Sequence, residues 1–245
     1  MIEKTRGIVL GTVPYKDNRM IVVMYTREHG RLSFATPLGT SRKSRGRSLL
    51  FQPLNILEFS MDHSAVPGKL SFIKDPKNLF PYGSIPFDPC KQSLALFLQE
   101  FLLKVLRMEE DQPNQSLYAF LEHSLRLLDS LLEGYSNFHL VFLMKLARFL
   151  GLSPNLEGYD PMSYFDMQSA SFTSSRPLTH PYFLSIADTQ SFVRIIRMDF
   201  SNMRFFRFSR QDRFRVLSLM NDYYRLHVPD FPQLSSLEIL KEIYD

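Results

Sequence analysis

The hydrophobic period of this sequence changes once, from two residues to 3.6, across a proline-rich segment. Before residue 75, short β-branched segments alternate apolar and polar residues, the pattern of half-buried strands. Between residues 75 and 89, four prolines and a glycine interrupt any regular element, since proline is excluded from helix interiors and central strands. Beyond this segment, apolar residues recur at helical spacing. The chain is therefore predicted to be α+β, with a β domain over residues 1–78 and a helical domain over residues 79–245.

The first domain is predicted to be a small barrel. Turn-forming residues separate its candidate strands, which are residues 5–13, 20–25, 31–37, 50–61 and 69–75. Five short strands with no helix between them suit a five-stranded OB-fold barrel, because closure removes exposed sheet edges.

The second domain is predicted to be all-helical apart from one loop-rich insertion. Helices are expected over residues 92–110, 115–132 and 137–150, with their apolar stripes forming the core of a bundle. The period is lost over the insertion, residues 152–184, where one short hairpin is expected around residues 165–172.

Three capping boxes predict where later helices begin, since a serine and an acid three residues on satisfy free N–H groups. The pairs are Ser185 with Asp188, Ser209 with Asp212, and Ser235 with Glu238.

The sequence offers little to support an enzyme. It has no glycine-rich phosphate loop, no nucleophile elbow and no zinc-protease motif, and its six histidines are scattered singly. Asp160 and Asp166, together with a histidine, would serve a metal-dependent nuclease, which is the alternative from another functional class. The single cysteine, Cys90, excludes an intrachain disulfide and a four-cysteine zinc site. We therefore predict no catalytic residue, no cofactor and no metal site.

The expected compartment is the cytoplasm, without a membrane partner. No apolar run approaches the roughly 18 residues of a membrane span, the N-terminus does not read as a signal peptide, and one cysteine suits a reducing environment.

Positive charge is concentrated near the N-terminus. Residues 1–57 hold ten bases and three acids, whereas the whole chain has a net charge of only +4. This asymmetry predicts a polyanionic partner. The highest density of positive charge lies in a loop whose bases alternate with serines and glycines, a composition suited to phosphate contacts. The four bases are Arg42, Lys43, Arg45 and Arg47.

Aromatic residues near this loop could stack on unpaired bases. Tyr15 and Tyr25 are the candidates, whereas Phe34 and Phe51 are expected in the barrel core.

A second basic stretch, residues 194–215, alternates seven arginines with five phenylalanines. Three interpretations stay open: the arginines clamp the carboxylates of an acidic, aromatic peptide tail, bind a nucleic-acid backbone, or pack around a phenylalanine core. The candidate partner-binding residues are Arg204, Arg207, Arg210 and Arg213.

Several runs, in this order along nearly the whole chain, resemble the RecO recombination mediators. The N-terminal runs are Thr5–Leu10, Tyr15, Thr26-Arg27-Glu28-His29-Gly30-Arg31, Gly39–Ser44 and Phe51-Gln52-Pro53-Leu54. The C-terminal runs are Phe205–Arg210, Tyr223–His227 and Leu234–Leu237.

The resemblance implies an N-terminal OB-fold, a helical C-terminal domain and a non-enzymatic role in bacterial DNA repair. Such proteins bind single- and double-stranded DNA, anneal complementary strands and engage the C-terminal tail of single-stranded-DNA-binding protein. With RecR they help load RecA on coated single strands. The DNA-binding set predicted here is Arg31, Arg42, Lys43, Arg45 and Arg47.

Two departures from the family pattern stand out. Leu38 precedes Gly39, where the family often has arginine. Residues 152–184 contain no cysteine, although many members carry a four-cysteine zinc site there, so no structural zinc is expected. Besides the nuclease, the other alternative is a protein-interaction scaffold whose basic loop is incidental.

Overall fold

The computed structural model describes residues 2–15, 19–37, 48–62, 69–109 and 113–243. The chain divides into two compact units. Unit 1 combines Met1–Ser130 with Leu234–Ile243, and unit 2 consists mainly of Leu131–Gln233.

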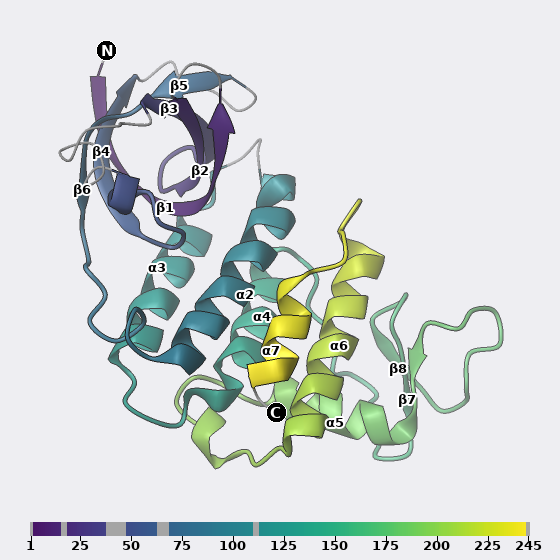
Figure 1. Ribbon diagram of the computed structural model, residues 1–245. Helices are drawn as coiled ribbons and strands as arrows, with labels where there is room; N and C mark the ends of the chain where they lie inside the picture. Colours follow the sequence, from purple (N-terminus) through teal and green to yellow (C-terminus); the bar gives the residue numbers. More distant parts are fainter. Residues whose placement is uncertain (1, 16–18, 38–47, 63–68, 110–112, 244–245) are drawn as a thin grey trace. The chain divides into compact units, whose positions relative to one another are not determined.

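Unit 1 begins with a curled mixed sheet of six strands, called the barrel below. The strands are β1 (Ile2–Tyr15), β2 (Arg19–Thr26), β3 (Gly30–Pro37), β4 (Ile56–Asp62), β5 (Leu70–Phe72) and β6 (Lys74–Asn78). Their order is β5-β3-β2-β1-β4-β6, and only the β3–β5 pair is parallel. Because Ile73 alone joins the two edge strands, the sheet must curl until its edges approach one another (Figure 1).

The predicted fold class, an OB-type barrel followed by helices, is confirmed. The strand count differs from the expected five, because the last predicted segment is split at Ile73. Ile73 is buried, and the following Asp75 has a φ of 48°, so the chain changes direction there and crosses from one sheet edge to the other.

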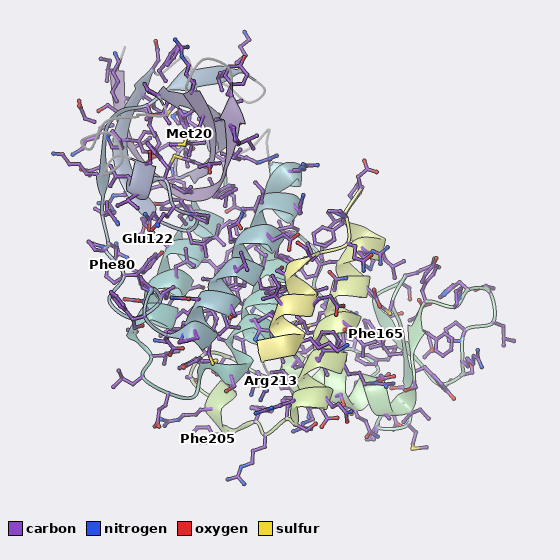
Figure 2. The ribbon with its side chains drawn as sticks, viewed as in Figure 1. Met20, Phe80, Glu122, Phe165, Phe205 and Arg213 are labelled. Atoms are coloured by element: carbon purple, nitrogen blue, oxygen red, sulfur yellow. The ribbon has the colours of Figure 1, made fainter. Side chains whose placement is uncertain are left out.

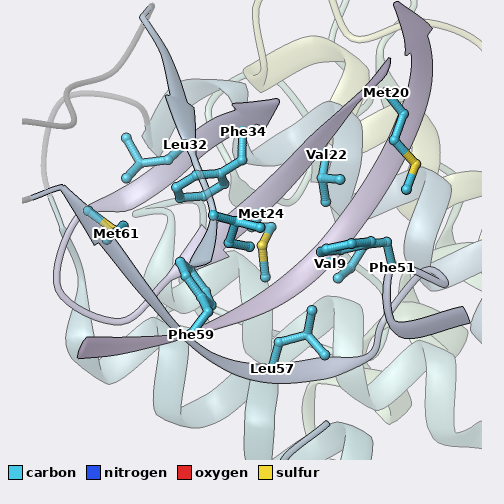
Figure 3. Close-up of a cluster of buried hydrophobic side chains, with 11 residues drawn as sticks. Val9, Met20, Val22, Met24, Leu32, Phe34, Phe51, Leu57, Phe59 and Met61 are labelled. Carbon is cyan, nitrogen blue, oxygen red and sulfur yellow. The ribbon is translucent and has the colours of Figure 1, made fainter. Parts of the chain in front are cut away.

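The inside of the barrel is filled by side chains at alternate positions of its strands (Figure 3). Phe34 and Phe59 meet edge to face, with their ring centroids 5.2 Å apart. Burying a side chain of this class contributes about 1.5–3 kcal/mol. The buried members of this cluster are Val9, Met20, Val22, Met24, Leu32, Phe34, Phe51, Leu57, Phe59, Met61 and Ile73.

Strand β4 begins later than predicted. Residues 48–50 form a helical turn, and Leu54 adopts a φ of 66°. The buried Asn55 amide donates to the carbonyls of Leu49 and Leu50, each at 3.1 Å. Pro53 lacks an N–H for a ladder, and the asparagine offers the backbone a local alternative to the sheet. The prediction of a strand over residues 50–55 is therefore wrong.

Three α-helices and a short 3₁₀ helix complete unit 1. They are α2 (Pro89–Val105), η1 (Leu106–Glu109), α3 (Gln115–Ser130) and α7 (Ser236–Ile243). Helices α2 and α7 pack side by side (Figure 1).

The proline-rich connector between barrel and helices is fixed by a carboxylate on α3. Asp129 accepts the backbone N–H groups of Gly83, Ser84 and Ile85 at 2.8–2.9 Å. Burial raises the pKa of Asp129, but these hydrogen bonds outweigh it, so the pKa lies below its usual value. The buried Lys91 ammonium donates to Ser84 Oγ at 2.6 Å and to the Asp129 carbonyl at 3.1 Å.

Unit 2 combines helices with the predicted hairpin, which packs on α5 at the edge of the unit (Figure 1). The helices are η2 (Tyr135–Asn137), α4 (Phe138–Phe149), α5 (Ile186–Ile196) and α6 (Arg210–His227), with the short η3 (Met203–Phe205) between the last two. A small sheet in the insertion pairs β7 (Tyr164–Asp166) with β8 (Ser171–Thr173) and β9 (Phe183–Leu184), which confirms the hairpin. Phe165, labelled in Figure 2, is fully buried. Its ring lies 5.1 Å from that of Phe192, which anchors the sheet on α5.

Two of the three predicted capping boxes form. The hydroxyls of Ser185 and Ser209 accept the N–H groups of Asp188 and Asp212 and so begin α5 and α6.

The third box does not form. The Glu100 carboxylate of α2 accepts the N–H groups of Ser235 and Ser236, at 3.1 and 2.8 Å, and the hydroxyl of Ser235 donates to it. A distant acid therefore caps α7 in place of the local serine.

Candidate nucleic-acid interface

The predicted DNA-binding loop lies outside the described residues. Arg42, Lys43, Arg45 and Arg47 belong to the connection that follows Pro37 at the end of β3, and the described chain resumes at residue 48. Their role therefore stays a prediction.

The strand ends next to this connection carry a cation, Arg19, and an exposed ring, Tyr15. Pro37 is paired with Arg19 of β2, and Arg19 is paired in turn with Tyr15 of β1. Tyr15 is 45% exposed, so its side chain is accessible to a base, and stacking itself stays a prediction. Tyr25, the other predicted stacking residue, is fully buried, so that expectation is wrong. Phe34 and Phe51 are in the core, as expected.

Sequence reasoning missed a second exposed ring, that of Phe72. It lies on β5, paired with Ala35 of β3, two residues before the strand ends at Pro37, and it is 60% exposed. The alternation of side chains along an extended segment could have indicated this ring. Ile73, the residue after β5, faces the core, and Phe72 therefore faces outward. Tyr15, Arg19 and Phe72 flank the departure of the basic loop, and these three residues and the loop are the candidate nucleic-acid interface.

Arg31 lies at the other end of β3. It precedes Pro37 by six residues, which is about 20 Å along a strand. It is half-buried and lies opposite Tyr25 of β2. The structure therefore does not bring Arg31 together with the departure of the loop.

The β2–β3 hairpin next to Arg31 is held by polar contacts to β1. His29 Nε2 lies 3.0 Å from Glu3 Oε2, and the Thr5 hydroxyl donates to the Glu28 carboxylate. The N–H of Arg27 donates to the carbonyl of Arg6 at 3.0 Å.

Three arginines of the second basic stretch make defined contacts within unit 2, although two of them, Arg194 and Arg215, are exposed. Arg213 is half-buried, and its guanidinium donates to Asn137 Oδ1 at 3.1 Å and to the carbonyl of Phe208 at 3.3 Å. Arg194 stacks on Phe208, with its guanidinium carbon 4.4 Å from the ring centroid. Hydrogen bonding from Arg215 is the main cause that lowers the pKa of Asp188.

The other three candidate arginines are exposed, namely Arg204, Arg207 and Arg210. Beside them the ring of Phe205 is 69% exposed (Figure 2). Exposed guanidinium groups next to an exposed ring can contact a carboxylate and an apolar side chain together.

The two aspartates of the nuclease alternative serve their own turns. Asp160 accepts the N–H of Met162 at 2.7 Å, and Asp166 accepts the N–H of Gln168 at 2.9 Å. His180 Nε2 lies 3.5 Å from the Asp166 carboxylate. Across the described ranges, no three His, Cys, Asp or Glu side chains form a group that could hold a metal ion. No helix within those ranges is long and apolar enough to span a membrane.

Comparison with known proteins gives one family over the chain. The model "Recombination protein O N terminal" matches residues 1–78, and "Recombination protein O C terminal" matches residues 86–158. The chain is 48% identical over 244 residues to the DNA repair protein RecO of Phocaeicola vulgatus, with 100% of both chains covered. It is 46% identical to that of Bacteroides fragilis and 37% identical to that of Porphyromonas gingivalis, again with 100% of both chains covered.

Proposed function

The chain belongs to the RecO family of DNA repair proteins, and on that premise we propose that it is a non-enzymatic, DNA-binding recombination mediator. It binds single- and double-stranded DNA, anneals complementary strands and, with RecR, helps load RecA on single strands coated by single-stranded-DNA-binding protein. It acts in the cytoplasm. Residues 1–78 are the nucleic-acid-binding domain, and residues 79–245 are the helical domain.

One observation carries the DNA-binding part of the proposal. The connection that leaves β3 holds Arg42, Lys43, Arg45 and Arg47, and it starts beside the exposed rings of Tyr15 and Phe72. Cations for the phosphates and rings for the bases are the two components of sequence-tolerant single-strand binding. The loop carries no Asn or Gln suited to bidentate base contacts, so affinity should depend little on sequence.

The tail of single-stranded-DNA-binding protein is proposed to bind the second basic stretch. The exposed Arg204, Arg207 and Arg210 would contact its carboxylates beside Phe205, and Arg213 would hold the segment in place through Asn137. Charge reversal at Arg207 and Arg210 should then weaken binding of an acidic tail peptide. Unchanged peptide affinity with an intact circular dichroism spectrum would contradict this assignment.

The DNA-binding proposal is tested by the salt dependence of affinity. We expect replacement of Arg42, Lys43, Arg45 and Arg47 by alanine to weaken binding of a fluorescent oligothymidine and of duplex DNA. Each lost phosphate contact should flatten the plot of log affinity against log salt by about 0.7 for single strands and about 0.9 for duplex.

A charge-matched control separates the loop from general electrostatics. The variant Arg42→Ala/Arg45→Ala removes two charges, as does Arg107→Ala/Arg148→Ala at exposed helical positions. Only the first pair should change the slope. Equal effects of the two pairs would contradict a specific role for the loop, and shortening of labelled strands with magnesium or manganese would contradict the non-enzymatic proposal.

A further inference from the structure

Unit 2 contains a groove with a volume of about 610 Å³, between its small sheet and the C-terminal part of α6 (Figure 1). Residues 181–184, which include β9, the last strand in the order β8-β7-β9, form one wall together with Met167. Helix α6 and the turn that follows it form the other wall. The two walls are joined by His227, whose Nε2 donates to the carbonyl of Met167 at 2.7 Å. The volume is in the range of sites that take a ligand or the side chains of a peptide.

The sheet wall offers accessible rings. Tyr182 is 45% exposed, and Phe183 is half-buried, as is Leu226 on the opposite wall. The ring of Phe183 already contacts a cation, since the guanidinium carbon of Arg176 lies 4.8 Å from its centroid. Aromatic faces attract cations, and the aliphatic stems of lysine and arginine pack against apolar surface. This wall therefore suits a side chain with an apolar stem and a positive end.

The helix wall carries two carboxylates with little compensation from the rest of the chain. The carboxylate of Asp222 forms only a long ion pair, 3.9 Å from the guanidinium of Arg225. Burial raises the pKa of Asp222 more than the charge of Arg225 lowers it. Asp230 makes no hydrogen bond or ion pair with any residue that the structure describes. Two acids and one base therefore line this wall, and a closer cation would stabilise both acids.

The end of α6 adds to this negative potential. The groove reaches the last turn of α6, and the carbonyls at the C-terminal end of a helix carry partial negative charge. The turn beyond the helix is held by Phe231, which is buried and has its ring centroid 6.3 Å from that of Tyr224. Its N–H donates to the carbonyl of Val228 at 3.4 Å. The carboxylate of Asp230 is therefore presented from a packed turn at the negative end of the helix.

We propose that this groove docks a basic, amphipathic segment of a partner protein. Lysine or arginine side chains of the segment pair with Asp222 and Asp230, and its apolar side chains contact Tyr182 and Leu226. Charge complementarity selects this partner, because the carboxylates repel both DNA phosphates and the acidic peptide assigned above to the second basic stretch. The inference goes beyond the proposed function and does not depend on it.

The test measures, by fluorescence anisotropy, how the full chain binds a short fluorescein-labelled peptide that alternates leucine and lysine. A peptide that alternates leucine and glutamine tests the need for charge. The chain has a net charge of +4, so its overall charge opposes the binding of a basic peptide. We expect the lysine peptide to bind, the glutamine peptide to bind at least about tenfold more weakly, and the affinity for the lysine peptide to fall with added salt.

The variant Asp222→Asn/Asp230→Asn removes both charges and keeps the size of the side chains. It should bind the lysine peptide about tenfold more weakly, the loss expected for two partly exposed ion pairs. Asparagine tolerates the φ of 51° at position 230, so the melting temperature should stay at the wild-type value. Glu133→Gln/Glu157→Gln, at exposed positions of unit 2, also removes two charges and is the matched control, which should leave the peptide affinity unchanged.

Four results would overturn the assignment. The first two are a wild-type chain that does not bind the lysine peptide, and equal effects of the two double variants. The third is self-association of the wild type in sedimentation equilibrium that Asp222→Asn/Asp230→Asn abolishes, which would make a second copy of the chain the occupant. The fourth is a lower affinity of that variant for oligothymidine, which would contradict a protein partner. Weak peptide binding by the variant with wild-type affinity for oligothymidine would support a site separate from the DNA interface.

Discussion

Asn137 is the residue of unit 2 whose truncation should cost most for its size. It is 3% exposed and makes three hydrogen bonds to groups distant in sequence. Its amide donates to the carbonyls of Met203 at 3.1 Å and Phe206 at 2.8 Å, and its Oδ1 accepts from Arg213 Nε at 3.1 Å. One side chain therefore joins the start of α4 to the segment before α6 and to α6 itself.

The expected cost of Asn137→Ala follows from these bonds. Two neutral hydrogen bonds contribute about 1 kcal/mol each, and one to a charged group contributes about 1.5–3 kcal/mol. The free energy of unfolding should fall by about 3.5–5 kcal/mol. Arg213→Met leaves the two amide donations in place and should cost about half as much.

The assay is urea denaturation followed by far-ultraviolet circular dichroism and tyrosine fluorescence, since the chain has no tryptophan. Gln168→Ala at an exposed position is the control and should change the free energy by less than about 0.5 kcal/mol. A loss below about 1 kcal/mol for Asn137→Ala would refute the claim that this side chain joins the three segments.

Three further changes have defined outcomes. Burial lowers the pKa of His139 to about 3, so below about pH 6.5 the unfolded chain binds a proton that the folded chain does not. The free energy of unfolding should therefore fall by up to about 1.4 kcal/mol per pH unit as the pH drops from 6.5. His139→Leu should reduce this pH dependence, which urea denaturation midpoints at several pH values measure. Asp129→Ala removes the acceptor for residues 83–85 and should lower the free energy of unfolding in urea by about 2–4 kcal/mol, whereas Asp222→Ala, at an exposed position on α6, should not. Gly134 has a φ of 75°, and a Cβ there would lie 3.0 Å from the side chain of Arg204, so Gly134→Ala should lower the melting temperature by several degrees; an unchanged value would contradict this.

Local patterns predicted the elements of this fold well, because their causes are local. The change of period located the barrel and the helices, and the boxes at Ser185 and Ser209 began their helices as expected. The box at Ser235 failed because Glu100, 135 positions away in sequence, competes for the same N–H groups. No local pattern contains that acid.

The candidate site was less predictable, because exposure depends on which face of a strand is covered. The burial of β2 alternates only as far as Met24, and both faces are buried at Tyr25, so its ring cannot stack. The exposure of the Phe72 ring follows from the burial of Ile73 in the core, which depends on the folding of the sheet. Arg31 and the basic loop are close in sequence, but β3 separates them by its whole length.

The capping of α7 by Glu100 has a consequence for the order of assembly. Ser236 and Glu100 are 136 positions apart, and every residue of unit 2 between 131 and 233 intervenes. Closing a flexible loop costs conformational entropy that grows with the logarithm of the loop length. For a loop of this length, the length-dependent part of the free-energy cost is about 4 kcal/mol. A ribosome releases α7 after residues 131–233 of unit 2, so the helix of unit 1 that packs on α2 is synthesised after them. Prior folding of unit 2 would shorten that loop, and in every nascent chain unit 1 can be completed only after all of residues 131–233 have been synthesised.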